Sequence, residues 1–233
     1  QEDIDEVFGE AVCNHLVTQK LAALADFRET GLEVGVMSAE AYPSEDFPGE
    51  RVSTVLHFRS VRDRMQEVYV PRQYEQVLEY IFSGLEISRS VLPSEARAPS
   101  GSATGIKTQI FDFAQVARFN VYSLGEDFPA VLAAEEEKAR SRGTEVMQMF
   151  INLGEACAGR AVDYLRDKGY FFGGFLPRWF DTDGLFMQKL VKLPNFGSIK
   201  LDSERAHKIL GLIRRDIEGN PACRALLSRS CWR

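Results

Sequence analysis

The sequence has little of what metal centres and disulfide frameworks require. Its 233 residues include few thiols and imidazoles, namely Cys13, Cys157, Cys223, Cys231, His15, His57 and His207. No CxxC pair occurs, and no histidine stands at metal-ligand spacing from a second histidine or cysteine. We therefore predict no metal site and reduced thiols, which indicate a cytoplasmic protein. Cys223 and Cys231 are near enough in sequence to pair, although nothing in the pattern requires it.

The chain also lacks a basic surplus and a long apolar run. It carries 28 Lys and Arg against 34 Asp and Glu, which gives a formal net charge of -6. Nucleic-acid binding depends on clustered cations that neutralise phosphates, so we expect no nucleic-acid partner. No segment is apolar over a membrane-spanning length and no signal peptide is evident, so we expect no membrane partner either.

What remains is the composition of a globular protein. Hydrophobic residues make up 45% and charged residues 27%, enough for one large domain or two small ones. The chain begins at Gln1 rather than Met, and its first ten residues resemble the middle of a longer sequence. We therefore count other domains of a longer chain among its candidate partners.

One stretch, Glu145 to Leu190, organises the prediction. It reads as a buried strand over 146–153, a helix over 155–168 ended by Gly169, and an aromatic strand over 170–176. The Asp-rich turn 181–184 then leads into a last strand over 185–190. We expect the helical crossover to place the first two strands parallel and adjacent, and the turn to pair the last two antiparallel.

The rest of the chain alternates in the same way. The predicted helices are 8–25, 72–85, 128–142 with Asp127 as its cap, and a last one to Glu218 begun by Asp202 or Ser203. The predicted strands are 31–37, 52–59, 66–70, 108–113 and 116–122, with loops at 38–50 and 92–105.

An imperfect internal repeat is also present. Phe8 to Phe58 and Asn152 to Leu190 share the order helix, strand, loop, strand, and each has a polar residue near its helix start. The identity between the two is low, so coincidence stays open beside a true duplication.

The second half of the chain resembles a known protein family. Phe150-Ile151-Asn152, Ala161, Tyr164-Leu165 and Gly169-Tyr170 look like the "N…A…LY…GF" signature of the GCN5-related N-acetyltransferases, the acyl-CoA N-acyltransferase superfamily. The likeness covers Val68 to Leu193, and Phe8 to Arg59 resembles the last third of another copy. It implies an α/β fold with a mixed, mostly antiparallel central sheet flanked by helices, and a tandem partial repeat sharing one continuous sheet.

The resemblance also implies a division of the chain and a cleft. Residues 1–62 would be the C-terminal part of a first unit, 63–193 a second unit, and 194–233 a C-terminal helical appendage. The strands at 146–153 and 170–176 should diverge at one end and leave a cleft for acyl-CoA.

Two departures from the family affect catalysis. A Gln/Arg-x-x-Gly-x-Gly/Ala loop before the family's central helix binds the pyrophosphate of acyl-CoA through backbone N–H groups. Here residues 124–129 supply one glycine, two acids and Pro129. The family's tyrosine general acid lies four residues before the glycine, where this chain has Leu165; Tyr164 is one place away, about 100° around the helix.

Seven residues are candidates for a site. Glu126 as a base and Tyr164 as an acid are the catalytic candidates. The candidates for cofactor binding are Asn152, Gly173, Gly174, Arg178 and Trp179. The glycines would admit a backbone approach, Arg178 would meet an anion, and Trp179 would form an apolar wall. Each also has a structural explanation: helix entry for Asn152, a bulge for the glycines, and core packing for the aromatics.

Two functional hypotheses follow. The first is an acyltransferase that moves an acyl group from acyl-CoA to an amine. The second is a catalytically degenerate module of a larger signalling protein that binds a small-molecule ligand and serves regulation. A purely structural scaffold is a third. Because carboxylates and a proline stand where a pyrophosphate would bind, we expect weak or absent acyl-CoA binding.

Overall fold

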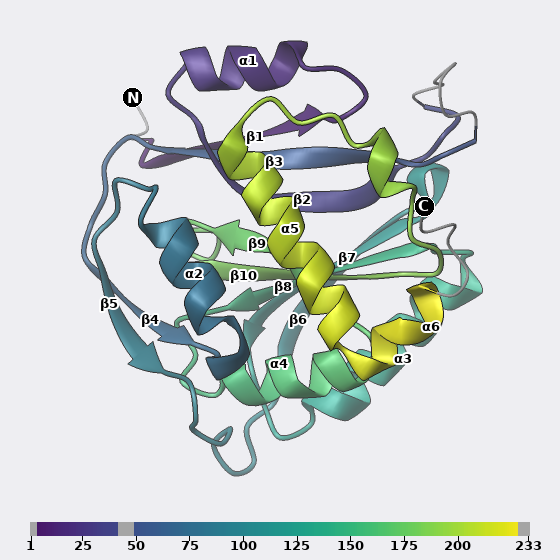
Figure 1. Cartoon of the computed structure of the whole chain (residues 1–233). Helices are drawn as coiled ribbons and strands as arrows, with labels where there is room; N and C mark the ends of the chain where they lie inside the picture. Colours follow the sequence, from purple (N-terminus) through teal and green to yellow (C-terminus); the bar gives the residue numbers. More distant parts are fainter. Residues whose placement is uncertain (1–3, 42–48, 228–233) are drawn as a thin grey trace.

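The computed structural model describes residues 4–41 and 49–227 (Figure 1). Part of the predicted loop 38–50, and Cys231 with its predicted pairing choice, lie outside the described residues. The strands are β1 (Glu6–Val12), β2 (Arg28–Met37), β3 (Val52–Ser60), β4 (Gln66–Val70), β5 (Arg89–Pro93), β6 (Gly105–Phe111), β7 (Val116–Ser123), β8 (Val146–Asn152), β9 (Phe171–Leu176) and β10 (Gly184–Leu190). The α-helices are α1 (Val17–Leu24), α2 (Glu75–Phe82), α3 (Phe128–Ser141), α4 (Ala158–Asp167), α5 (Glu204–Gly219) and α6 (Arg224–Leu227), and short 3-10 turns lie at 72–74, 112–114, 196–198 and 221–223.

The large sheet has the order β1-β3-β2-β9-β10-β8-β7-β6. Its only parallel pair among the described strands is β7 with β8, which α3 connects; the other neighbours run antiparallel. The predicted fold class, a mixed and mostly antiparallel sheet flanked by helices, is confirmed. A separate parallel pair, β4 with β5, lies at the side.

The predicted adjacency of β8 and β9 is wrong. Strand β10 lies between them and pairs antiparallel with both. The short turn after β9 leads into β10, which pairs with one edge of β9. The other edge of β9 pairs with β2. A strand therefore fills the place where the cleft was expected.

Two other local predictions fail. Residues 8–12 form part of strand β1, paired with β3 from Glu6↔Ser60 to Val12↔Thr54, and the helix begins only at Val17. The apolar residues of this short segment fit a helical period by coincidence. The segment forms a strand because it pairs with β3. Strand β5 was also not predicted, and its end extends into the predicted loop 92–105. Its pairing with β4, which precedes it by a whole helix, gives no local signal in the sequence.

The order of the six strands β1-β3-β2-β9-β10-β8 is symmetric about the junction between β2 and β9. In β1-β3-β2 and in β8-β10-β9, a strand, a helix and two further strands follow in sequence, and the last strand lies between the other two. The pairing of the Gly31 and Val52 runs, which the repeat requires, is confirmed. The duplication itself, and the division at residues 62 and 193, stay predictions.

The two halves of the sheet join through glycines. Gly31 of β2 is opposite Gly174 of β9. A Cβ atom on Gly31 would lie 2.5 Å from the Gly173 carbonyl oxygen, and one on Gly174 would lie 2.7 Å from the Gly31 Cα. Any side chain there would push the strands apart, so the continuous sheet depends on these glycines.

Helices α2, α4 and α5 cover one face of the large sheet (Figure 1). Ser203 caps α5 by accepting a hydrogen bond from the Ala206 N–H at 2.9 Å. Ile209, Ile213 and Ile217 of α5 are fully buried in the main core, and the helix packs on β2 and β9. The C-terminal helix thus lies directly over the glycine junction. No helix within residues 4–41 and 49–227 has the length and hydropathy needed to cross a membrane.

The other face of the sheet curls around a second, smaller core. Its buried members are Leu56, Phe58, Phe150, Leu176 and Phe186, and Trp179 and Phe180 pack against them. Strands far apart in the sheet order meet across this face, since Arg118 of β7 forms ion pairs with Glu10 of β1 at 3.2 Å and Glu33 of β2 at 3.1 Å.

Glu6 of β1 lies at the rim of this curled face. Its Oε2 accepts a hydrogen bond from the Ser60 hydroxyl at 2.7 Å, and its Oε1 is buried without a partner among the described residues. Burial, opposed by the Ser60 hydrogen bond and by the charges of Arg89 and Arg178, raises the pKa of Glu6 to about 7. The folded chain therefore holds this proton to higher pH than the unfolded chain does.

We predict that Glu6 makes stability fall as pH rises. Its contribution is fully present below the unfolded pKa, about 4.3 for glutamate, and is lost as pH rises through the folded value near 7. Urea unfolding at pH 5, 6, 7 and 8 should show a steeper decline for the natural chain than for Glu6→Gln, whose amide carries no titrating proton. Equal slopes in the two proteins would contradict the assignment.

The glycine junction gives a second prediction. Gly174→Ala should lower the free energy of unfolding by about 3 kcal/mol, the upper end for overpacking a core, because its Cβ would overlap the Gly31 backbone. Gly211→Ala is the matched control, since Gly211 lies in α5 with open space around it. Alanine there should be neutral or stabilising by about 1 kcal/mol. Similar losses for both variants in denaturant unfolding would disprove the junction's role.

Candidate functional site

A cavity of about 370 Å³ opens where helices α3 and α4 begin. It is lined by Arg97, Ala98, Leu124, Gly125, Glu126, Phe128, Pro129, Cys157, Arg160, Ala161 and Tyr164. The structure thus brings together both predicted catalytic residues, Glu126 and Tyr164. A volume of this size is in the range of small-ligand sites.

The wall of the cavity is apolar and its rim is cationic. Leu124, Phe128 and Ala161 are buried, and the Phe128 ring meets the Tyr164 ring edge-on at 6.1 Å between centroids. Arg97 and Arg160 are exposed, and neither guanidinium makes a hydrogen bond or ion pair with another described residue. Two exposed cations beside an apolar wall suit a ligand with an acidic group and an apolar body.

Three of the backbone N–H groups at the start of α3, those of Gly125, Glu126 and Phe128, already have acceptors within the protein. The Gly125 N–H donates to the Thr104 hydroxyl at 3.0 Å, and the Glu126 N–H donates to the Ser102 carbonyl at 3.2 Å. The Phe128 N–H donates to the Gly125 carbonyl, and Pro129 has no N–H. A pyrophosphate would find none of these four positions free to donate.

The acids of this segment hold the same neighbouring loop. Glu126 Oε2 accepts from the Gly101 N–H at 2.9 Å, and Asp127 Oδ1 accepts from the Thr104 N–H at 2.8 Å. Asp127 therefore does not cap α3 with its side chain, which corrects the prediction. A Cβ on Gly125 would lie 2.4 Å from the Ser102 carbonyl oxygen, so this loop packs directly on the glycine.

The start of α4 is occupied in a similar way. The Gly159 N–H donates to the Ser94 hydroxyl at 2.8 Å, and that hydroxyl donates to the Ala156 carbonyl at 3.0 Å. Burial is the main reason why the pKa of the Cys157 thiol is raised, so it is a poor nucleophile. An acidic ligand in this cavity would therefore depend on the arginine side chains rather than on helix N–H groups.

Tyr164 is half-buried on the cavity side of α4, with the Lys168 ammonium 5.2 Å from its ring centroid. Leu165, at the position of the family's tyrosine, is fully buried in the main core. The tyrosine that lines the cavity is therefore Tyr164, at the neighbouring position, and its role as an acid stays a prediction.

Asn152 joins strand ends instead of lining this cavity. Its Nδ2 donates to the Tyr122 carbonyl of β7 at 3.0 Å, and its Oδ1 accepts from the Gly154 N–H at 2.8 Å and the Thr182 hydroxyl at 2.5 Å. Strands β7 and β8 are paired from Val116↔Val146 to Val121↔Ile151. The Asn152 bridge continues this pairing past the end of the ladder.

Gly173 and Gly174 lie in the packed middle of the sheet, away from the cavity. A Cβ on Gly173 would lie 2.4 Å from the Phe186 ring, and Gly174 contacts Gly31. These contacts leave no space for a ligand on the faces where it was expected. The glycines are explained by strand packing.

Arg178 and Trp179 belong to the turn between β9 and β10. Arg178 is 8% exposed and forms ion pairs with Asp5 at 2.8 Å and Asp181 at 3.1 Å. The Trp179 ring stacks on Phe150 with 5.2 Å between centroids, and its indole N–H donates to Asn120 Oδ1 at 2.8 Å. Both side chains contact other residues of the protein, and neither lines the cavity at the start of α3 and α4.

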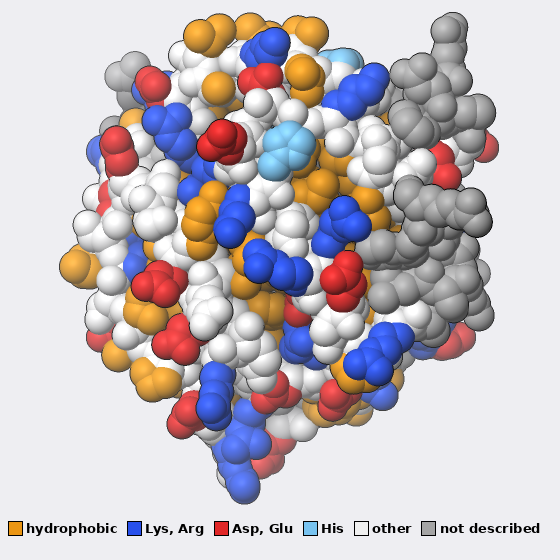
Figure 2. All heavy atoms as spheres, in the orientation of Figure 1, with side chains coloured by type: hydrophobic (Ala, Val, Ile, Leu, Met, Phe, Trp, Pro, Cys, Tyr) orange, Lys and Arg blue, Asp and Glu red, His pale blue; other side chains and the backbone are white. Residues whose placement is uncertain are grey.

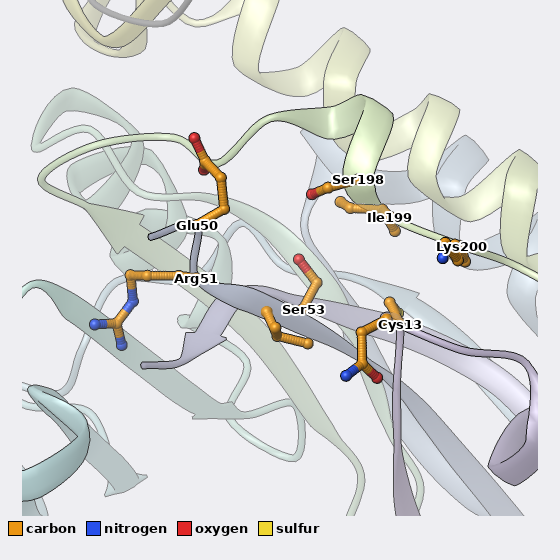
Figure 3. Close-up of a pocket in the computed structure, with 9 residues that line it drawn as sticks. Cys13, Glu50, Arg51, Ser53, Ser198, Ile199 and Lys200 are labelled. Atoms are coloured by element: carbon orange, nitrogen blue, oxygen red, sulfur yellow. The ribbon is translucent and has the colours of Figure 1, made fainter. Parts of the chain in front are cut away.

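A second hollow, shown in Figure 3, lies where β1 ends beside β3 and the segment before α5. Its volume is about 20 Å³, room for about one water molecule. The Arg51 guanidinium points away from it and donates to the Val36 and Ala114 carbonyls at 2.9 and 2.7 Å. Burial raises the pKa of Cys13 to about 12. The hollow is too small for a ligand.

Sequence reasoning missed Arg97 and Arg160. Arg97 stood in a predicted flexible loop and Arg160 on a helix face without a motif, and only the meeting of the two segments makes them neighbours of one cavity. No group of three or more metal-ligating side chains was found among the described residues.

The comparisons with known proteins yielded structural neighbours alone. No family model matches the chain, and no curated protein matches it. Ard1 from Thermoplasma volcanium is similar at 17% identity and a TM-score of 0.31, over 40% of this chain and 66% of its own. Ribosomal-protein-alanine N-acetyltransferase from Brucella melitensis is similar at 24% identity and a TM-score of 0.29, over 41% and 66%. Both matches span about two-fifths of this chain at a TM-score near 0.3, and they assign no residue a role.

Proposed function

We propose that this chain is an N-acetyltransferase-like module that binds a small ligand between α3 and α4 without transferring an acyl group. The observation that carries the proposal is the occupied start of α3, where Ser102 and Thr104 take the N–H groups of Glu126 and Gly125. Acyl-CoA needs such donors free for its pyrophosphate.

Three further features support a degenerate site. Asn152 bridges β7 and β8 at the end of their ladder. Leu165 stands buried at the position of the expected acid. Glu126, the candidate base, accepts a hydrogen bond from the loop at Gly101. A module with these properties would serve ligand-dependent regulation within a longer protein.

The ligand class follows from the wall and the rim. Leu124, Phe128 and Ala161 provide an apolar surface, while Arg97 and Arg160 supply exposed cations at its rim. We propose a small molecule with one carboxylate or phosphate and an apolar body.

Acyl transfer from acyl-CoA to an amine is the second candidate. One observation favours it: Glu126 and Tyr164, a potential base and acid, line the same cavity. Coenzyme binding separates the two candidates.

Calorimetric titration with acetyl-CoA and with free coenzyme A should give no heat at millimolar ligand. One unfavourable charge pair at about 4 Å costs on the order of 1 to 4 kcal/mol, roughly a tenfold to thousandfold loss in affinity. The double variant Glu126→Gln, Asp127→Asn should still not bind, because the N–H groups stay occupied. Low-micromolar binding of acetyl-CoA by the natural chain would favour the acyltransferase hypothesis. Binding by the double variant alone would show that the two carboxylates, and not the occupied N–H groups, prevent coenzyme binding.

The ligand class is tested with octanoate and phenylacetate, and with benzylamine as the probe of opposite charge. The two carboxylates should bind, benzylamine should not, and Arg160→Ala should weaken binding about tenfold, equivalent to about 1.4 kcal/mol. Arg215→Ala, an exposed arginine on α5 whose side chain contacts its own helix at Gly211, is the matched control. Affinities unchanged by Arg160→Ala in ligand-observed NMR would refute the site.

A further inference from the structure

A groove lies between helix α2 and the pair of strands β4 and β5, which are at the side of the molecule (Figure 1). Its volume is about 550 Å³, and its lining residues are Val70, Glu75, Glu79, Phe82, Ser83 and Val91. Most of the lining surface is apolar: Val70 belongs to the main core, Phe82 packs on it, and Val91 is 51% exposed. An apolar floor open to water on this scale indicates a binding surface.

The charges above this floor are of one sign. Glu75 and Glu79 are exposed and lie one helical turn apart on α2. Neither carboxylate makes a hydrogen bond or ion pair with another residue of the described ranges 4–41 and 49–227. Figure 2 shows acidic and hydrophobic side chains together in this region. Like charges at this spacing destabilise a helix by a few tenths of a kcal/mol, and a cation between them would reverse that cost.

Strand β5 adds a second binding element. It pairs with β4 on one side, and within the described strands nothing pairs with its other edge. An extended peptide could lie along this edge with alternate side chains directed into the groove.

We propose that the groove binds an extended peptide segment of a partner protein, with an apolar anchor flanked by lysine or arginine. The apolar floor takes the anchor, and Glu75 and Glu79 pair with the cations. A second copy of this chain is a poorer occupant, because its net charge of -6 would oppose an acidic surface.

This surface is independent of the proposed ligand site. The groove shares no lining residue with the cavity around Glu126 and Tyr164. A failure of one proposal therefore leaves the other standing, and variants in one site serve as controls for the other.

The test uses a fluorescein-labelled nonapeptide in which leucine and lysine alternate, and a control peptide with glutamate in place of each lysine. In fluorescence anisotropy the lysine peptide should bind with an affinity that falls as salt rises, and the glutamate peptide should not bind. Glu79→Lys should weaken binding at least tenfold. Glu218→Lys, the same charge change at an exposed position of α5, should leave it unchanged.

The floor is tested with Val91→Arg, which places a cation on an exposed position of β5 and should abolish binding while the melting temperature stays the same. If Glu79→Lys and Glu218→Lys weakened peptide binding equally, the net charge of the protein alone would explain the attraction, and the proposal would be overturned. Equal binding of both peptides, or no binding of either, would also overturn it. Dimers in size-exclusion chromatography that Val91→Arg dissociates would assign the groove to a second copy instead.

Discussion

The contact between Gly31 and Gly174 is the constraint on which the rest of the structure depends. It joins β2 to β9 at a distance that admits no Cβ atom at either glycine, and so makes one eight-stranded sheet from the group β1-β3-β2 and the group β9-β10-β8-β7-β6. Helix α5 packs on the continuous surface that β2 and β9 form. Its residues Ile209, Ile213 and Ile217 are part of the core over the junction. The curl that brings Arg118 within reach of Glu10 also requires this continuity.

The same kind of close packing decides the chemistry near α3. The segment 101–104 lies so close to Gly125 that its Ser102 carbonyl and Thr104 hydroxyl accept the N–H groups of Glu126 and Gly125, which an anion would otherwise use. What remains accessible is side-chain chemistry: an apolar wall, a tyrosine and two arginines. The mixed sheet and a helix start with few available donors are compatible, since fold alone does not specify activity.

The sequence predicted the elements whose signals are local. Helix α3 and the strands β9 and β10 with their turn follow from periodicity, and the start of α5 follows from the two capping candidates Asp202 and Ser203, of which Ser203 is the cap. It could not predict that β10 would enter between β8 and β9, or that residues 8–12 would pair with β3, because those outcomes depend on distant partners. Gly173, Arg178 and Trp179 were recognised as unusual, yet their reasons are packing and ion pairing. Glu126 and Tyr164, chosen from the sequence, line one cavity and their roles stay predictions, whereas Arg97 and Arg160 were identified only from the structure.

Amide hydrogen exchange at Gly125 and Glu126 tests the central claim most directly. If the Thr104 hydroxyl and the Ser102 carbonyl hold these N–H groups, both amides should exchange slowly in the free protein. Their rates should not change when millimolar acetyl-CoA is added. Fast exchange in the free protein that becomes protected on adding acetyl-CoA would contradict the account, because it would show an open cradle that the coenzyme fills.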